Sequence, residues 1–300
     1  MKIITVPIPE LFSYGQNLVY LKRSPNECMY RIEADRIYKA ISLGEANAVI
    51  EVSEAEDGGL RVEIIGGVAE QYYGDNILEA IEEYVVDWFD LKRDLSPFYE
   101  IAASDPLLKE TVDQFYGLRV MGIPDLFEAL CWGIIGQQIN LAFAYTLKRR
   151  FVELYGRAVE ANGELHWLFP KAEDIALLTV ADLEPLRMSV KKSEYLIEAA
   201  QNIVSGKLSK ETLLQGECLK SAEALLVSIR GIGPWTAHYV IMRCLRFPSA
   251  FPIDDVGLHN SIKHITGMDR KPTKQELLKL SAGWGGWESY ATFYLWRLLY

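Results

Sequence analysis

Apolar and polar residues alternate along the first third of the chain, a pattern typical of β-strands with one face on a core and the other in water. The alternation runs through residues 28–34, 36–43, 47–53 and 60–65. Short polar or glycine-containing turns, such as DGG at 57–59, separate these segments. The pattern predicts an antiparallel sheet.

A helical pattern follows the predicted strands. Between Asn76 and Trp88 the apolar residues recur at intervals of three and four, namely Ile77, Leu78, Ile81, Tyr84, Val85 and Trp88. This spacing places them on one face of a helix, which we expect to cover the sheet. Together these elements predict a small α+β domain over residues 1–110.

The chain changes character from Pro106 onward, where apolar residues keep the helical period and nearly every junction holds Pro or Gly. No alternating strand pattern returns. We therefore predict an all-α domain over residues 111–300. The expected helices span residues 125–136, 139–155, 172–180, 191–205, 220–228, 234–246, 255–266 and 274–282.

The composition is that of a globular protein, since 50% of the residues are hydrophobic and 24% are charged. This balance excludes a disordered or fibrous chain. No segment approaches the run of about eighteen uncharged apolar residues that a membrane span requires. The first residues, MKIITVPIPE, lack the apolar core of a secretion signal. We expect a cytoplasmic protein that does not bind membranes.

The formal charge of −10 is unevenly distributed. Residues 1–110 carry 10 Lys and Arg against 21 Asp and Glu, whereas residues 111–300 carry 21 against 20. The overall charge argues against indiscriminate coating of nucleic acid. The nearly neutral C-terminal part could still present a local surface to phosphate.

Cysteine and histidine spacing indicates neither a zinc site nor a disulfide framework. The four cysteines lie far apart without a CxxC pair, and the four histidines show no ligand spacing. We expect reduced thiols and no bound metal.

The most informative segment runs from Leu226 to Tyr239, with the sequence LVSIRGIGPWTAHY. A helix is expected to end at Gly231, which can adopt the left-handed conformation, and Pro234 suits the first turn of the next helix. Gly233 would let the chain turn between them. Free N–H groups of this hairpin would form a small anion site for a phosphodiester, although Gly-x-Gly also closes ordinary helical hairpins.

The longer string resembles a known family. LLVSIRGIGPWTAHYV followed by FPIDDVGLHNSI is similar to the helix-hairpin-helix and Gly/Pro-Asp element of the DNA glycosylase superfamily, in particular its AlkA-type 3-methyladenine branch. Residues 117–144 resemble the family's opening helices and Gly-Gln-Gln turn. Residues 284–296 resemble its Trp-x-x-Trp-x-Ser-Tyr-Ala terminus, and residues 85–108 the join between its domains. The resemblance implies an N-terminal antiparallel-sheet domain followed by a helical glycosylase domain with a central cleft.

The implied activity is release of alkylated purines from DNA in base excision repair. Such an enzyme flips the damaged nucleotide out of the duplex. The departing base leaves positive charge on the sugar, so a fixed carboxylate would stabilise the transition state and orient or deprotonate water. We expect no cofactor, although hairpins of this class can hold a monovalent cation when DNA is bound.

Two adjacent carboxylates could fill the catalytic role. In the family an aliphatic residue stands at the third position after the catalytic Asp; Leu258 fits this pattern for Asp255, whereas Asp254 would place Gly257 there. We assign Asp255 as catalytic and expect Asp254 to cap a helix or hold the loop. The alternative is that one or both only cap the helix that begins near Val256.

Trp235 occupies the position at which strand-cutting family members carry a lysine that forms a Schiff base with the sugar. A tryptophan cannot do so, and the resemblance therefore implies a monofunctional enzyme that leaves an abasic site. Trp235, Tyr239 and Trp287 match positions that line the base pocket, where aromatic faces suit a cationic alkylated base. Each ring could instead pack in a core.

The remaining assignments concern DNA contacts. Gln137, Gln138 and Ile139 stand where the family inserts a residue into the gap left by the flipped nucleotide, although they could equally form an ordinary turn. Further candidates contact the DNA backbone: Gly231, Gly233 and Thr236 in the hairpin segment, with Lys191, Lys192, Arg230 and the Thr236 hydroxyl as possible phosphate ligands.

The expected partner is double-stranded DNA that contains a damaged base, bound by a monomer. Two alternatives stay open on the sequence. One is a glycosylase of the same fold for an oxidised or deaminated base. The other is a non-catalytic DNA-binding module, which the acidic N-terminal third favours.

Overall fold

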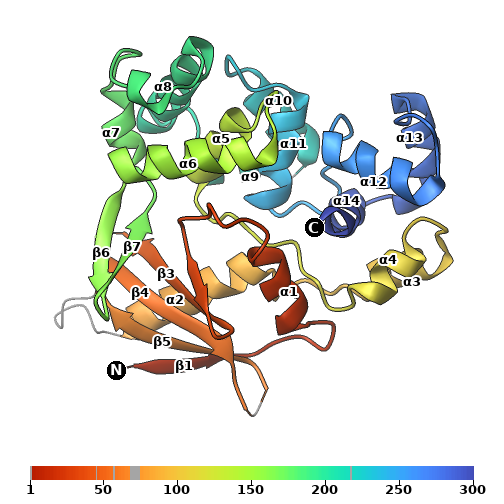
Figure 1. The fold of residues 1–300 in the computed structure, drawn as a ribbon, viewed down its shortest axis with the longest axis horizontal. Coiled ribbons are helices and arrows are strands. Elements are labelled where there is room, and N and C mark those ends of the chain that lie inside the picture. Colours follow the sequence, from red (N-terminus) through yellow and green to blue (C-terminus); the bar gives the residue numbers. More distant parts are fainter. Residues whose placement is uncertain (1, 45, 57, 68–74, 217) are drawn as a thin grey trace. The chain divides into compact units, whose positions relative to one another are not determined.

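A computed structural model describes residues 2–44, 46–56, 58–67, 75–216 and 218–300 (Figure 1). The chain forms two compact units, each assembled from separate stretches of sequence. The first unit contains Met1–Ile8, Ser24–Leu91 and Ile134–Lys207, and the second contains Pro9–Arg23, Lys92–Gly133 and Leu208–Tyr300. The predicted division at residue 110 falls inside a helix, α4 (Lys109–Gln114).

The first unit is built on a five-stranded antiparallel sheet with the order β1-β5-β4-β3-β2. Four of its strands coincide with predicted strands, and β1 is an addition because its sequence, IITV, does not alternate. The expected water-exposed face is absent along β4, where five consecutive residues, 48–52, are buried. The bounds are β1 Ile3–Val6, β2 Arg31–Glu33, β3 Arg36–Leu43, β4 Ala46–Glu54 and β5 Leu60–Gly66. The predicted DGG turn begins at Asp57, which lies outside the described residues.

The predicted helix after the strands is α2, Asp75–Phe89. Its apolar face is buried, with Ile81 and Val85 fully enclosed, and it packs against β1 and β3. This arrangement confirms the sequence interpretation of a helix that covers the sheet.

The first unit also contains a segment in which the sequence interpretation was wrong. A second hairpin, β6 (Arg157–Ala161) and β7 (Glu164–Leu168), interrupts the predicted all-helical region. Asn162 and Gly163 form its turn with φ values of 52° and 79°. Two-residue hairpin turns commonly require positive φ at both positions, which Asn and Gly adopt readily. Each strand is only five residues long and half of the ten residues are exposed, so the alternation is too short to predict a strand.

This hairpin joins the core of the sheet unit. Ala161 and Leu168 pack with Ala40 of β3 and Val49 of β4, and a Cβ at Gly66 would lie 2.8 Å from the Cβ of Ala161. The same unit contains three further helices, α6 (Leu141–Tyr155), α7 (Ala172–Ala176) and α8 (Val190–Val204), of which α6 contacts β7 and α7 packs against α8. Part of the predicted helical domain therefore packs with the sheet.

The second unit is helical in its described residues. Most of the predicted helices are present with ends shifted by a few residues, and α1, α3, α4, α9 and α14 are additions. The bounds are α1 Tyr14–Leu21, α3 Ser96–Ser104, α4 Lys109–Gln114, α5 Leu126–Ile135, α9 Lys210–Leu214, α10 Leu219–Val227, α11 Pro234–Arg243, α12 Val256–Thr266, α13 Lys274–Leu280 and α14 Glu288–Trp296. The last two residues of α5 belong to the first unit.

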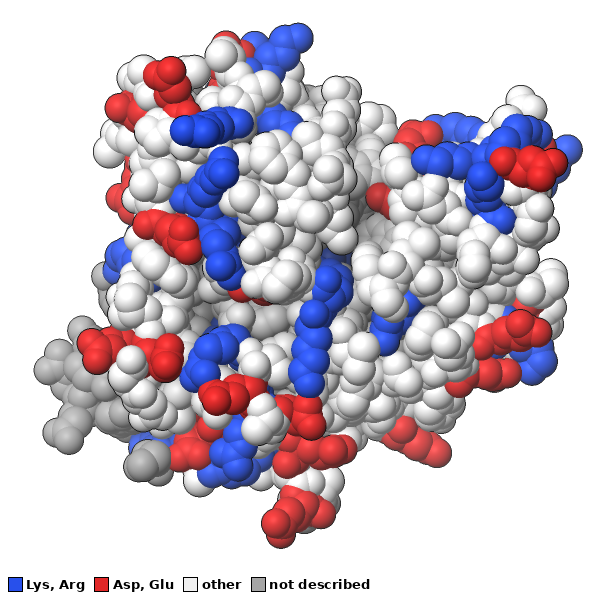
Figure 2. Space-filling view, in the orientation of Figure 1, with Lys and Arg blue, Asp and Glu red and all other residues white. Residues whose placement is uncertain are grey.

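Helix α14 forms the centre of the second unit, since every residue from Ser289 to Trp296 is buried. None of the helices in the described part of the chain combines the length and apolar character needed to cross a bilayer. On the face shown in Figure 2, acidic side chains gather over the sheet, and basic side chains over the region of α13.

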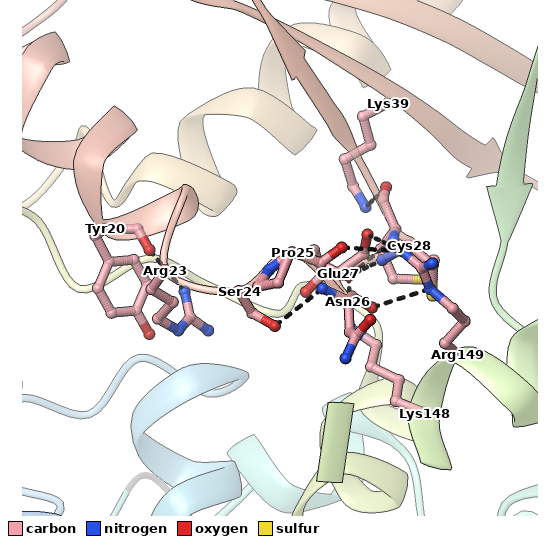
Figure 3. A network of polar contacts seen from close by, with 11 residues as sticks. Tyr20, Arg23, Ser24, Pro25, Asn26, Glu27, Cys28, Lys39, Lys148 and Arg149 are labelled. Atoms are coloured by element: carbon pink, nitrogen blue, oxygen red, sulfur yellow. Dashed lines mark hydrogen bonds and ion pairs between the residues drawn. The ribbon is translucent and has the colours of Figure 1, made fainter. Parts of the chain in front are cut away.

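A loop of the sheet unit is fastened to α6 by charged side chains (Figure 3). Arg149 donates from its guanidinium to three backbone carbonyl oxygens, at 3.2 Å to Pro25, 3.3 Å to Asn26 and 3.3 Å to Glu27. One side chain thus satisfies three consecutive carbonyl groups and joins a loop to a helix more than one hundred residues away.

Glu27 completes this attachment with a buried ion pair. Its Oε1 accepts backbone N–H bonds from Cys28 and Met29, both at 2.8 Å, and lies 3.4 Å from Nζ of Lys148. Both charged side chains are 7% exposed. Because a buried charge without a partner is costly, the pair holds α6 to the loop only while both members are present.

We predict that Lys148→Met lowers the free energy of unfolding by about 3 kcal/mol, because it removes the Lys148 ammonium from its ion pair with the buried Glu27 carboxylate. The matched control is Lys109→Met, which breaks the exposed pair with Asp113 on α4 and should cost less than about 0.5 kcal/mol. Urea unfolding followed by circular dichroism measures both. Equal losses for the two variants would contradict a structural role for the buried pair.

Candidate active site

Asp255 is the N-cap residue of α12. Its backbone is extended, with φ −69° and ψ 125°, and its Oδ1 accepts the backbone N–H of Leu258 at 2.8 Å. Its own N–H donates to the carbonyl of Pro252 at 2.8 Å. Asp255 therefore caps α12, which was the alternative to a catalytic role, and the catalytic role stays a prediction. Capping leaves Oδ2 available for other partners.

Two indole rings hold the rest of this carboxylate. Nε1 of Trp235 donates to Oδ2 of Asp255 at 2.9 Å, and Nε1 of Trp296 donates to Oδ1 at 2.7 Å. With the Leu258 amide, three N–H groups from three helices converge on one side chain that is only 9% exposed. Such donors compensate the cost of burying a carboxylate and fix its orientation.

Gly257 makes the approach of Trp296 possible. A Cβ at this position would lie 2.9 Å from Oδ1 of Asp255 and 3.1 Å from Cδ1 of Trp296. Cβ atoms essentially never lie within 3.0 Å of another heavy atom, so a side chain at residue 257 would displace the Asp255 carboxylate and crowd the indole that donates to it. This glycine is required by a close approach and not by its backbone conformation.

The neighbouring carboxylate has different surroundings. Asp254 is half exposed, and its Oδ2 accepts a bond from Nζ of Lys274 at 3.2 Å, at the start of α13. Asp254 therefore holds the loop against α13, which is one of its two expected roles. It does not fill the other expected role, because Asp255 caps α12.

Aromatic rings line one side of the Asp255 carboxylate. The centroid of Tyr239 lies 5.8 Å from that of Trp235 and 6.3 Å from that of Trp296, with interplanar angles of 31° in both pairs. Tyr239 is 4% exposed, and its hydroxyl accepts a bond from Arg243 at 2.7 Å, whereas Trp235 is only half buried. The buried ring of Tyr239 thus packs against the half-buried ring of Trp235.

Trp287 belongs to a second aromatic cluster. Its ring centroid lies 6.0 Å from that of Phe98 and 5.8 Å from that of Tyr290, and the side chain is half buried. The adjacent Glu288 begins α14, and burial raises the pKa of its carboxyl group. A pocket-lining role for Trp287 stays a prediction. Trp296, which sequence reasoning did not single out, contacts Asp255 together with Trp235.

The hairpin between α10 and α11 has the predicted local geometry. Gly231 is left-handed with φ +89°, Ile232 is 4% exposed and points inward, and Pro234 occupies the first turn of α11. Gly233 has φ −90° and ψ 174°, which any residue adopts, and a Cβ there would meet nothing within 4 Å. The glycine at 233 is therefore not needed for the turn, which corrects that part of the expectation.

Two of the predicted phosphate ligands point elsewhere. Thr236 is 1% exposed, and a Cβ at Gly133 would lie 2.7 Å from its Cγ2, so its side chain packs α11 against α5. Lys192 donates from Nζ to the carbonyl oxygen of Ile135 at 2.7 Å, and burial lowers the pKa of its ammonium. The proposed hydroxyl contact of Thr236 conflicts with this burial, and its backbone N–H remains the candidate.

The predicted DNA-inserting residues lie in the turn between α5 and α6, within the first unit. Gln138 is exposed with φ +55°, and Gln137 and Ile139 are half buried. Lys192 satisfies the last carbonyl of α5 on one side, and Asn140 caps α6 by accepting the N–H of Phe143 at 2.9 Å on the other. The turn is held at both ends and presents Gln138 outward.

No group of three or more His, Cys, Asp or Glu side chains within the described ranges is arranged to hold a metal ion. The four cysteines are free thiols, with Cys131 and Cys244 buried.

The sequence matches two protein families. Residues 131–285 match the HhH-GPD superfamily base excision DNA repair protein, and residues 3–130 match the 8-oxoguanine DNA glycosylase N-terminal domain. The chain is also 54% identical over 300 residues to a DNA-3-methyladenine glycosylase of Bacillus subtilis (strain 168). That alignment covers 99% of this chain and 97% of the relative.

Solved structures share the fold. A 3-methyladenine DNA-glycosylase from Archaeoglobus fulgidus superposes with a TM-score of 0.81 at 23% identity, covering 99% of this chain and 97% of that one. The Clostridium acetobutylicum 8-oxoguanine glycosylase/lyase in complex with double-stranded DNA gives a TM-score of 0.75 at 20% identity, covering 96% and 92%. The predicted fold, an N-terminal antiparallel-sheet domain followed by a helical domain, is confirmed.

The family match over residues 131–285 coincides with the segment that contains the hairpin, Trp235 and the cap of α12. Since the Bacillus subtilis relative also aligns along almost the whole chain, the resemblance found in the sequence is confirmed. The protein belongs to the HhH-GPD superfamily of base excision DNA repair proteins.

Proposed function

We propose that this protein is a DNA glycosylase that releases alkylated purines of the 3-methyladenine type from double-stranded DNA and leaves an abasic site. The observation that carries the proposal is the Asp255 carboxylate, which two indoles and a helix N-terminus hold in one orientation beside aromatic rings. The activity in the name of the relative that is 54% identical supports the choice of lesion.

The chemistry follows from charge. As the bond between base and sugar breaks, electrons leave with the base and the sugar becomes positively charged. A carboxylate fixed beside the anomeric carbon stabilises that charge, and it does so without reorganising because its donors already hold it. Asp255 would also orient the water that attacks the sugar, or accept its proton.

Trp235 is suited to two tasks at once. Its half-buried ring could stack on a cationic alkylated base, whose positive charge strengthens the contact with an electron-rich indole face. Its N–H group meanwhile donates to Oδ2 of Asp255. The base and the reacting sugar would then be placed relative to one another by a single side chain.

The same residue supports a monofunctional reaction. A lyase step needs an amine that attacks the sugar and forms a Schiff base. At residue 235 this chain has an indole, whose nitrogen carries a hydrogen that Asp255 accepts and has no free lone pair for attack. Water is then the nucleophile, no cofactor takes part, and the strand stays intact.

The DNA contacts would come from backbone and turn. The open space beside Gly233 lets a phosphate approach the N–H groups at the start of α11, where the helix dipole favours an anion. Exposed Gln138, in its left-handed conformation, is the side chain of the α5–α6 turn best placed to enter the gap left by a flipped nucleotide. We expect the protein to bind DNA as a monomer.

One observation favours a second candidate, removal of an oxidised base. Residues 3–130 match the N-terminal domain of 8-oxoguanine DNA glycosylase. Matched duplexes that contain N3-methyladenine or 8-oxoguanine separate the two candidates. Preferential release of 8-oxoguanine would replace the first proposal by the second.

We predict that Asp255→Asn reduces the single-turnover rate of base release from an alkylated duplex by at least about a hundredfold, because the neutral amide cannot stabilise a cationic sugar. Its affinity for the same duplex should stay close to that of the unaltered protein. The strand should break only after alkali treatment of the product. Unchanged base release would refute catalysis by Asp255, and cleavage before alkali would refute the monofunctional reaction.

We predict that Trp296→Phe lowers the rate of base release about tenfold while KM changes little, because the ring remains but the N–H bond to Oδ1 is lost. Trp284→Phe is the matched control, since it removes an indole bond of 2.9 Å to a different carboxylate, that of Asp105. If both variants lose activity equally per folded molecule, the effect of Trp296 is a general one and not exerted through Asp255.

A further inference from the structure

The segment that leads to Asp255 is fastened by side chains from several helices. We call Phe247–Asp255 the Asp255 loop. At its start, the Ser289 hydroxyl lies 2.7 Å from the carbonyl oxygen of Phe247 and 2.9 Å from that of Ala250, and its one hydrogen can be donated to either. Near its end, Nε2 of His259 lies 2.8 Å from the carbonyl of Ile253. Phe251 lies between these two contacts, and a residue of α11 binds its backbone.

His238 of α11 provides that middle contact. The backbone N–H of Phe251 donates to Nδ1 of His238 at 2.9 Å. On the opposite side of the ring, Nε2 lies 3.3 Å from Oε1 of Glu223 on α10. The histidine side chain is 15% exposed and that of Glu223 is 32% exposed, so the contacts lie at the edge of the interior.

The two contacts fix which nitrogen carries the proton. Nδ1 must be unprotonated, because it accepts the N–H of Phe251. A neutral imidazole then has its hydrogen on Nε2, where the Glu223 carboxylate accepts it. Glu223 thereby favours the tautomer that can hold the loop, in the way that a carboxylate orients a histidine elsewhere in enzymes.

Phe251 is close to Asp255 along the chain. The carbonyl of Phe251 accepts the N–H of Ile253 at 2.7 Å, and the carbonyl of the next residue, Pro252, accepts the N–H of Asp255 at 2.8 Å. Through these two short turns, the backbone of Asp255 is positioned relative to Phe251. A shift at Phe251 therefore displaces the carboxylate that Trp235 and Trp296 hold.

We propose that His238, oriented by Glu223, is a positioning residue that couples the helix-hairpin-helix to the Asp255 loop. The inference rests on the proposed function. Helices α10 and α11 flank the hairpin that would grip the DNA backbone, and the same two helices supply Glu223 and His238. The coupling sets the distance between the gripped phosphate and the carboxylate that acts on the sugar.

The test compares two substitutions of the histidine in single-turnover base release from a duplex containing N3-methyladenine. His238→Leu removes both contacts and should lower the rate roughly tenfold to a hundredfold, the scale expected for a small misplacement of a reacting group. His238→Asn retains an oxygen near the position of Nδ1 that can accept the Phe251 N–H, and it should keep most of the activity. Duplex affinity, which the hairpin provides, should be similar in both variants.

A double-mutant cycle separates positioning from general damage. If His238 acts through Asp255, His238→Leu should cause no further loss of rate when it is introduced into Asp255→Asn. A loss of the same factor in both backgrounds would overturn the proposal, as would equal activities of His238→Leu and His238→Asn. Thermal unfolding of each variant gives the fraction that is folded at the assay temperature, so that rates can be compared per folded molecule.

Base release by the unaltered protein distinguishes failure of the proposed function from failure of the coupling by His238. If it releases no base from any alkylated duplex, the proposed function fails before the histidine is tested. If it does release the base and His238→Leu retains the full rate, the proposed function stands and only the coupling by His238 is refuted.

Discussion

The structure of the second unit depends on how one buried carboxylate is satisfied. Asp255 retains 9% of its surface, and burying an ion without partners would cost several kcal/mol. Its partners are N–H groups from the first turn of α12, from α11 and from the end of α14. Three helices must therefore stay in register for the carboxylate to be stable. The residue that caps a helix is in this way also the residue with a fixed charge beside an aromatic surface.

This rigidity bears on the order of events in the proposed reaction. A carboxylate held at both oxygens cannot swing toward its substrate, so the sugar has to be brought to it. The elements suited to do so lie in the same unit, because the hairpin is continuous with α11, and α11 contacts both Asp255 through Trp235 and the Asp255 loop through His238. Binding energy from the phosphate backbone can then serve to place the sugar, because the hairpin that would bind the phosphate and the Asp255 carboxylate are both attached to α11.

Local features of the site were predictable from the sequence, and distant contacts were not. Asp255 as a cap, Gly231 in the left-handed conformation and Pro234 at a helix start each follow from a few neighbouring residues. Trp296 lies 41 residues from Asp255, and only the fold shows that Gly257 leaves room for its indole. The burial of Thr236 likewise depends on packing against α5. In the fold, the Asn162-Gly163 turn was a readable signal that the exposed strands around it obscured.

In the proposed reaction, the Asp255 carboxylate stabilises positive charge on the sugar. The most direct measurement is the affinity for a duplex in which a cationic pyrrolidine replaces the sugar at the lesion, relative to one with a neutral tetrahydrofuran. We predict that the unaltered protein prefers the cationic duplex by at least about tenfold, or about 1.4 kcal/mol, and that Asp255→Asn loses this preference. An equal preference in both proteins would contradict it, because the carboxylate would then make no electrostatic contribution at the sugar.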